Sequence, residues 1–334
     1  MRSLLFLLLA LTASTVFAWG YPGHEVVGSL ADQLLTPVAK KKLQEVAGIS
    51  LRSASKWPDC VKGVTAKDNA FKYEANPRYD ASCREFQTPD GIREMEEYAA
   101  RNWDSCSQSS NAEPCHRQFH YTNIAFQHDK YDRASSGTND HDIVSAINAA
   151  IGVLQGKPAP APFNIRSPRE ALFLLAHLIG DIHQPLHAGA VYLDSAGDPI
   201  DPDLSGEPFD QKTSTRGGNF IAVGSISLHA FWDEIPSSIK PDRITERMLT
   251  NAKAVGKTPG PVGSWSTTWA TETLVVSKPV FEGLTYVPDP NKPGRWTAEF
   301  KDRKAYLKEK NRLDREQLVR AGARLAQVLN EVWK

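Results

Sequence analysis

Most of the chain carries apolar residues at the spacing of helices, and only short stretches alternate between apolar and polar positions as strands do. The clearest helical segment covers residues 171–181, which are apolar on nearly every side. Ser167, Pro168 and Glu170 precede it as an N-cap, a first-turn proline and the glutamate of a capping box. This pattern predicts a helix buried in the middle of the fold.

Other helices are predicted by weaker patterns. Alternating charged and apolar faces indicate a long final helix over residues 304–333. Three further helix starts are marked by a capping residue or by a first-turn proline: Thr36 with Pro37, Asp140 before a helix through Leu154, and Pro241 with Asp242. Helices are therefore expected from one end of the chain to the other.

Strand patterns are few. Residues 219–225 and 284–287 alternate best, and the second stretch is expected to form part of a hairpin. Pro, Gly, Asp and Ser gather in residues 156–163 and 192–218, which predicts loops. The candidate ligands described below are scattered over residues 19–233, which argues against two independent domains. We therefore expect an all-α, mainly helical single domain with long loops and at most a small hairpin.

Residues 1–18 have the anatomy of a secretory signal, with Arg2 at a positive start, an apolar run over residues 4–11 and a small-residue cleavage pattern at residues 16–18. The apolar run is too short for a membrane span, and no later stretch reaches about 18 unbroken apolar residues. The sequence thus predicts a signal peptide over residues 1–18 and a mature domain over residues 19–334, secreted or periplasmic and without a membrane anchor. An uncleaved N-terminal anchor is the alternative. The absence of an Asn-x-Ser/Thr site favours a bacterial origin.

Charge limits the ways in which the chain can bind a polyanion. The full sequence has 39 basic and 39 acidic residues, and loss of Arg2 with the leader leaves one net negative charge. A near-neutral domain does not bind phosphate backbones tightly through charge alone. If the substrate is a nucleic acid, a metal centre has to supply the local positive charge.

The four cysteines support an exported protein. Outside the reducing cytosol an even number of cysteines indicates disulfides, and four cysteines allow three pairings. We favour the sequential pairing of Cys60 with Cys83 and of Cys106 with Cys115. A thiolate metal site is the weaker alternative, because no Cys-x-x-Cys unit is present.

Two histidine–aspartate pairs have the spacing of neighbours on one helix face. His177 precedes Asp181 by four positions, and His229 precedes Asp233 by four. Such a pair can bind one cation through nitrogen and oxygen, and an unpartnered pair within an apolar helix such as that of His177 would be costly. A single pair of this kind is more often hydrogen-bonded on a helix surface. The metal interpretation therefore depends on the further candidates.

Trp19 becomes a candidate ligand through its position. After cleavage behind Ala18 it would carry a free α-amine, a neutral nitrogen donor near physiological pH. The remaining candidates are single histidines or aspartates in distinctive surroundings: His24, Asp59 after Trp57-Pro58, His120 between Phe119 and Tyr121, and His187 after His183-Gln184-Pro185-Leu186. Each of these alone has a bland interpretation, as a helix end or as packing, but together they favour a metal centre.

From Trp19 to Asp233 these residues resemble, in order, the S1/P1 nucleases, a family of secreted, single-strand-specific zinc nucleases with 3′-nucleotidase activity. The block from His177 to His187 is the most specific part of the match. The resemblance implies a mainly helical fold of the phospholipase C and zinc nuclease type, with three zinc ions (Zn²⁺) in a cleft. It implies three ligand sets: a first of Asp59, His120, His177 and Asp181; a second of the Trp19 amine and carbonyl oxygen, His24 and the bridging Asp181; and a third of His187, His229 and Asp233.

The resemblance also implies an activity. The chain would be an endonuclease that hydrolyses single-stranded DNA and RNA to 5′-phosphorylated products and acts on 3′-nucleotides, through a metal-activated hydroxide that attacks phosphorus in line. Asp59 would orient the nucleophile, Lys62 would contact phosphate, and Asn219 in Gly217-Gly218-Asn219 would contact a base. A solvated surface lysine and a plain turn are the alternatives for Lys62 and Asn219. We expect a monomer with no stable protein partner.

Several side chains remain without an assigned task. His183 is expected to be structural, and His116, His128 and His141 have no role. Base stacking would explain a preference for single strands, but the sequence does not rank Tyr121, Tyr192 and Phe209 as platforms. The loop over residues 188–216 is longer than in compact relatives. It is expected to be a solvated insertion, and its acidic residues do not have the spacing of an EF-hand calcium loop.

Two other functions compete with a nuclease. A zinc phospholipase C resembles this family in fold and metal site, but such enzymes usually have glutamate at the position of Asp233 and a longer gap between the tryptophan and the first histidine. A noncatalytic zinc-binding protein is the second alternative. The presence of Lys62 and Asn219 beside a complete ligand set disfavours it.

Overall fold

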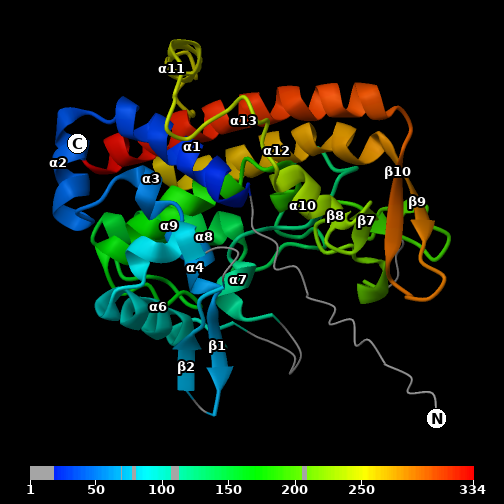
Figure 1. Cartoon of the computed structure of the whole chain (residues 1–334), viewed down its shortest axis with the longest axis horizontal. Coiled ribbons are helices and arrows are strands. Elements are labelled where there is room, and N and C mark those ends of the chain that lie inside the picture. Colours follow the sequence, from blue (N-terminus) through cyan, green and yellow to red (C-terminus); the bar gives the residue numbers. More distant parts are fainter. Residues whose placement is uncertain (1–18, 69, 77–79, 107–112, 205–208) are drawn as a thin grey trace, which may run out of the picture.

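The structure is a computed structural model that describes residues 19–68, 70–76, 80–106, 113–204 and 209–334. The expected signal peptide over residues 1–18 lies outside the described residues. The described chain is mainly helical, as predicted, and Figure 1 shows the long helices α12 and α13 side by side along one edge. No helix in the described ranges combines the length and apolarity needed to cross a lipid bilayer.

The helices are spread over the whole described chain, and the strands are short. The helices are α1 (Gly20–Leu34), α2 (Pro37–Val46), α3 (Leu51–Ala54), α4 (Trp57–Val61), α5 (Asp80–Cys83), α6 (Pro89–Arg101), α7 (Cys115–Gln118), α8 (Ile143–Leu154), α9 (Pro168–Asp181), α10 (Leu228–Asp233), α11 (Glu246–Lys253), α12 (Trp265–Glu282) and α13 (Arg303–Val332). The strands are β1 (Val64–Lys67), β2 (Ala70–Tyr73), β3 (Ile124–Ala125), β4 (Gly189–Ala190), β5 (Tyr192–Leu193), β6 (Pro199–Ile200), β7 (Ile221–Val223), β8 (Ile226–Ser227), β9 (Leu284–Pro288) and β10 (Trp296–Phe300).

Helix α9 lies at the centre of the core. Every residue from Glu170 to Asp181 is buried, and α9 contacts α1, α3, α4, α8 and α13. Its start follows the predicted capping pattern, because the Ser167 side chain accepts a hydrogen bond from the Glu170 amide. The Glu170 carboxylate accepts instead from the amide of Arg166, one residue before the cap, and pairs with Arg101. The continuous apolar pattern of α9 therefore reflects burial on all sides.

The first and last helices pack against each other. Helices α1 and α13 are in extensive contact, and Gly322 makes this possible because a Cβ at that position would lie 2.6 Å from the Cβ of Leu30. Contacts of both helices with α9 complete a layer around the central helix. The final helix was predicted to within one residue at each end.

Two predicted helix starts were wrong. Helix α8 is capped by Asp142, whose side chain accepts from the Ser145 amide, and not by Asp140; its end at Leu154 agrees with the prediction. Helix α11 begins at Glu246 after the cap Thr245, and not at Pro241. Asp59 lies in the first turn of the short α4 and does not end a helix. In the first two cases a polar residue close to the true boundary could have taken the same role.

There is more β-structure than the single expected hairpin. β9 and β10 form that hairpin, but β7 and β8 extend it to a four-stranded sheet in the order β8-β7-β10-β9. β7, which lies within the predicted stretch 219–225, pairs with β10 in parallel, so that Ile221 is opposite Trp296. β1 with β2 forms a separate hairpin. Parallel pairing between distant segments leaves no local signal in a sequence.

Candidate metal centre

The ends of α1 and α9 bring the first ligands together. The two oxygens of Asp181 lie 3.1 Å from Nε2 of His24 and 3.1 Å from Nε2 of His177. The imidazole rings of His24 and His177 stack with centroids 3.7 Å apart. Gly180 is needed for this approach, since a Cβ there would lie 2.8 Å from Nδ1 of His24. All three ligand side chains are fully buried.

His120 and Asp59 complete this cluster from two other elements. Nδ1 of His120 lies 3.0 Å from Nε2 of His177 and 2.9 Å from Asp181. Asp59, in the first turn of α4, places Oδ1 3.6 Å from Nε2 of His177. The Cys60–Cys83 disulfide ties α4 to α5 directly beside Asp59. The residues of the first expected set are therefore together, and His24 of the second set lies among them.

The third group forms where α10 faces the segment after α9. Nδ1 of His187 donates to the carbonyl oxygen of His120 (2.6 Å), and Nδ1 of His229 donates to that of Gly217 (2.7 Å). Both rings are thereby held with Nε2 unprotonated in the neutral state. Nε2 of His187 faces Nε2 of His229 at 3.0 Å, and Oδ1 of Asp233 lies 3.9 Å from Nε2 of His229. Two lone pairs at this distance repel each other unless a cation lies between them.

Trp19 occupies the junction of the groups. Its indole nitrogen donates to the Gly180 carbonyl (2.9 Å), and its backbone nitrogen donates to Oδ1 of Asp233 (3.1 Å). Its carbonyl oxygen accepts from the Gly23 amide in the first turn of α1. The nitrogen expected in the second set thus contacts a carboxylate of the third set, and the carbonyl oxygen takes part in helix hydrogen bonding.

The residues fit divalent cations on three observations. First, the candidate ligand atoms form three buried groups within 4.8 Å: His24, Asp59 and His177; His120, His177 and Asp181; and His187, His229 and Asp233. Second, the Nε2 lone pairs of His187 and His229 are directed at each other. Third, Nδ1 of His24 and Oδ2 of Asp233 are buried and have no hydrogen-bond partner within the described ranges of the chain. Nitrogen and oxygen ligands of this kind suit zinc and related ions.

Burial and neighbouring charges set the protonation of the site. Burial, with His187 as a smaller cause, lowers the pKa of His229 to about 3. Burial also lowers the pKa of His24, His120 and His187, so these rings are neutral and ready to bind a cation. Burial acts in the opposite direction on Asp233 and raises its pKa well above the ordinary value.

Asp181 differs from Asp233. Burial alone would raise its pKa, but the surrounding His177, His187 and His24 hold the pKa well below the usual range. Asp181 is therefore ionised at neutral pH, as a carboxylate bridging two cations needs to be. Burial alone would lower the pKa of His177, but Asp181 and Asp59 raise it. The centre thus places an ionised carboxylate beside an imidazole that holds its proton more tightly than usual, and a bound cation would replace that proton.

The two expected substrate residues lie beside the ligand groups. Nζ of Lys62 is 2.7 Å from Oδ1 of Asp59, and only 12% of the Lys62 side chain is exposed, so it is not a solvated surface lysine. Asn219 donates from Nδ2 to the Arg216 carbonyl, whereas its Oδ1 is buried without a hydrogen-bond partner. Gly217 has a positive φ of 59°, and its carbonyl orients His229.

One positioning residue was not identified from the sequence. Nε2 of Gln184 donates to Oδ1 of Asp233 at 2.8 Å, within the block that separates Asp181 from His187. The sequence signal that could have identified Gln184 is its position between the candidate ligands Asp181 and His187. His183 is turned away, with Nδ1 donating to Ile179 and Nε2 facing Arg324, which agrees with the structural role expected for it.

The other unassigned histidines lie elsewhere. His128 pairs with Asp201 and Asp203 of the long loop, at 3.1 and 3.4 Å. His116 is buried against Tyr98 and Trp103. Neither contacts the ligand groups in any interaction that the structure shows.

The cysteines form two disulfides, Cys60–Cys83 and Cys106–Cys115, which is the sequential pairing.

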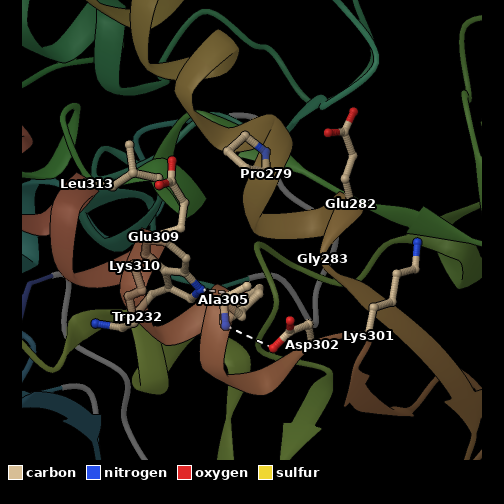
Figure 2. A pocket seen from close by; sticks show the side chains of 11 residues that line it. Trp232, Pro279, Glu282, Gly283, Lys301, Asp302, Ala305, Glu309, Lys310 and Leu313 are labelled. Carbon is tan, nitrogen blue, oxygen red and sulfur yellow. Dashed lines mark hydrogen bonds between the residues drawn. The ribbon is translucent and has the colours of Figure 1, made fainter.

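A cavity of about 310 Å³ lies between α10, α12 and α13 (Figure 2). Its lining includes Trp232, Pro279 and Lys310 but none of the candidate ligands. The candidate metal centre is therefore separate from this cavity.

The chain is similar to known proteins of one family. The model of the S1/P1 Nuclease family matches residues 19–334. Endonuclease 2 of Arabidopsis thaliana is 24% identical over 230 residues, and Endonuclease 4 of the same plant is 26% identical over 232 residues. Each alignment covers 66% of this chain and 57% of the relative, so the match spans less than two thirds of the relatives' length.

Proposed function

Because the chain belongs to the S1/P1 nuclease family, we propose that it is a zinc-dependent endonuclease. It would hydrolyse the phosphodiester bonds of single-stranded DNA and RNA to 5′-phosphorylated products and would release phosphate from 3′-nucleotides. The observation that carries this proposal is the convergence of five histidines and three aspartates in buried groups, with imidazole lone pairs directed at one another.

Three zinc ions would share these ligands. Asp59, His120, His177 and Asp181 would hold one, the Trp19 amine, His24 and Asp181 a second, and His187, His229 and Asp233 a third. When bound, zinc would lower the pKa of water and offset the negative charge of a phosphate group. The lowered pKa values of His24, His120 and His229 support this, since neutral rings bind a cation without first losing a proton.

The chain's own side chains would bind and orient the substrate. Asp59, which accepts from Lys62 and lies next to His177, would orient the nucleophile through its carboxylate. Nζ of Lys62 would donate to a phosphate oxygen, because it is held by Asp59 on the side of the first ligand group. Oδ1 of Asn219 would accept from the edge of a base, since it has no hydrogen-bond partner among the residues that the structure describes.

Aromatic contacts would favour single strands. Tyr192 is 1% exposed, and its hydroxyl donates to the Asn123 carbonyl, so it is not available as a stacking platform. Phe209 is 37% exposed and meets Tyr192 edge to face. Tyr121 follows His120 directly in the chain. Unstacked bases can lie on such rings, whereas paired bases cannot.

Export would complete the enzyme. Removal of residues 1–18 would convert the Trp19 amide into an amine within the metal centre, where the indole is already held by Gly180. The two disulfides suit an oxidising compartment, either the periplasm or the exterior. We propose that the mature protein is a monomer and acts without a protein partner.

The test combines metal content with substrate choice in protein that begins at Trp19. We expect about three zinc ions per chain. Single-stranded DNA should be cleaved much faster than duplex DNA, and the products should carry a 5′-phosphate. Release of phosphocholine from phosphatidylcholine without nuclease activity would replace the proposal with a phospholipase C. Zinc binding without either activity would leave a noncatalytic zinc-binding protein, and absence of bound zinc would refute the metal centre.

A further inference from the structure

Two arginines lie against one phenylalanine ring beside the third ligand group. The Cζ atom of Arg295 is 3.1 Å from the ring centroid of Phe220, and that of Arg216 is 4.8 Å from it. An aromatic ring holds a guanidinium group through its flat face and leaves the N–H groups of the edge directed outward. The same ring therefore restricts the orientation of both cations.

The fold fixes this arrangement through a parallel strand pair. Ile221 of β7 is opposite Trp296 of β10, and the Trp296 amide donates to the carbonyl of Phe220 at 3.0 Å. Arg295, the residue before Trp296, is thereby brought to Phe220 from 75 positions away in the chain. The position of this arginine depends on backbone pairing and not on a flexible loop.

Arg216 is fixed by an unusual backbone conformation. Its φ is 50°, and Gly217 and Gly218 follow with φ of 59° and 82°. A left-handed conformation costs a residue other than glycine of order 1 kcal/mol. The conformation is held by the turn, in which the amide of Phe220 donates to Thr215 and that of Asn219 donates to Arg216. A strained arginine between the long loop and two glycines points to a role for its side chain.

The arginine pair adjoins the metal centre. The carbonyl of Gly217, one residue after Arg216, accepts the hydrogen bond that orients His229. A Cβ at Gly217 would lie 3.0 Å from the carbonyl oxygen of Leu186, the neighbour of His187, and 3.5 Å from Nδ1 of His229. Arg216 therefore adjoins the side of the centre where His187 and His229 meet.

The positive charge of this pair is not neutralised within the described part of the chain. No carboxylate there forms an ion pair with Arg216 or Arg295, and Nη1 of Arg295 is buried without a hydrogen-bond partner. Burial, together with the nearby Arg216, lowers the pKa of Arg295. Two adjacent cations that repel each other and have no counter-ion form a site for an anion.

We propose that Arg216 and Arg295 form a subsite for a second phosphate of a nucleic-acid strand, next to the scissile phosphate on the side of His229. This inference rests on the proposed nuclease function and extends it. Guanidinium groups donate two parallel hydrogen bonds to a phosphate, so the pair would bind a phosphodiester firmly in a near-neutral protein. Strands with several phosphates would then be better substrates than 3′-mononucleotides, which have none to place there.

The test uses the zinc-loaded full chain and a neutral double variant, Arg216→Met with Arg295→Met, because methionine keeps an unbranched side chain against Phe220. The probe is a fluorescein-labelled, cleavage-resistant phosphorothioate strand of ten thymidines, and its binding is followed by anisotropy at several salt concentrations. We expect about tenfold weaker binding and a slope of log K against log salt reduced by about 0.7 for each phosphate that the variant no longer binds.

Two controls separate a phosphate subsite from a packing defect. Arg303→Met removes an arginine that lies over Phe300 at the other end of β10, and it should bind the strand as the wild type does. The double lysine variant, Arg216→Lys with Arg295→Lys, should recover most of the affinity and of the salt slope, because it restores the charge.

The outcomes distinguish this inference from the nuclease proposal. On an unmodified strand of ten thymidines, which the enzyme can cleave, the Met variant should lose at least about five times more kcat/KM than on a 3′-mononucleotide. A Met variant that binds the phosphorothioate strand with wild-type affinity and salt slope overturns the subsite alone, provided that the wild type cleaves the unmodified strand. A wild type that neither binds the phosphorothioate strand nor cleaves the unmodified strand overturns the nuclease function and the subsite together. Weaker binding with an unchanged salt slope would replace the phosphate contact with base stacking and also overturns the inference.

Discussion

The backbone nitrogen of Trp19 lies 3.1 Å from Oδ1 of Asp233, a residue 214 positions away in the chain. The indole nitrogen of the same residue donates to Gly180, beside Asp181. The indole of Trp19 thus holds the start of the described chain between two ligand groups, whether the Trp19 backbone nitrogen is an amide or an amine. That state, an amide or a free amine, is what processing would change.

Protein that begins at Trp19 should bind about one more zinc ion than protein in which Ala18 is retained, because a peptide nitrogen has no lone pair for a metal. The retained residue should also remove most nuclease activity. Metal analysis and cleavage of single-stranded DNA on both forms measure this, with circular dichroism as the control for folding. Equal zinc and equal activity in the two forms would refute the amine as a ligand.

Removal of metal should destabilise the protein, and the effect should depend on pH. Each site contributes about 4 kcal/mol when free zinc is 1,000-fold above Kd. Burial raises the pKa of Asp233 well above its usual value, so protons compete with zinc for this carboxylate as the pH falls. The zinc-dependent increase in Tm should therefore be larger at pH 7.5 than at pH 5. An increase that does not change with pH would contradict the assignment of Asp233.

Two isosteric variants should lose different amounts of zinc. Asp181→Asn removes the carboxylate that lies within 3.1 Å of His24, His120 and His177, and we expect it to lose about two ions. Asp233→Asn affects only the third group, and we expect it to lose about one ion. Metal analysis at a fixed zinc activity measures both. An equal loss in the two variants would argue against a bridging role for Asp181.

Lys62→Met should lower kcat/KM by about 100-fold for every phosphate substrate, since it removes the cation that is proposed to contact the reacting phosphate. Lys62→Arg should recover part of this loss. Asn219→Ala is the matched control: it should mainly raise KM, and by different factors for different bases. A Met variant that lowers only Tm and keeps the wild-type kcat/KM would show that Lys62 has no role in the reaction.

Asp314 should make stability depend on pH at a distance from the metal centre. It is buried in α13 and pairs with Lys310 at 2.8 Å, yet burial raises its pKa from 3.8 to about 6. The folded state therefore holds this proton more tightly than the unfolded state, so the contribution of Asp314 falls as the pH rises from about 4 to about 6. The shift corresponds to at most about 3 kcal/mol.

Asp314→Asn should accordingly gain stability relative to the wild type between pH 4 and pH 7. The difference between the two unfolding free energies, measured by denaturant titration at each pH, cancels the groups that both proteins share. A difference that is constant over this range would show that the Asp314 pKa is not raised.

The sequence was informative wherever function requires residues close together in one element. His177 with Asp181, and His229 with Asp233, could be placed on common helix faces because four residues make about one helical turn. The start of α9 could be placed because Ser167 and Pro168 have strong positional preferences. Long-range relations were recovered only through the family resemblance, which already implied that His120 and Asp59 meet the others.

Other features could not be predicted because the local sequence is compatible with more than one structure. Asp140 and Asp142 can both cap a helix, and tertiary packing selected the second. The register that brings Arg295 to Phe220 is set by a parallel pair of strands far apart in the chain, so neither segment signals the other. For the same reason, the stacked arginines had no recognisable pattern in the sequence.

The packing of α1 against α13 has a consequence for the order in which the protein is assembled. His24 is carried by α1, and α1 has its most extensive contacts with α13, which is synthesised long after α1. A nascent chain that ends before Arg303 would expose Leu30 and the rest of this contact surface of α1. In such a chain His24 would not be held in position to bind a cation. The proposed metal centre would thus form only after α13 has been synthesised, and products truncated before α13 would be inactive and prone to aggregate.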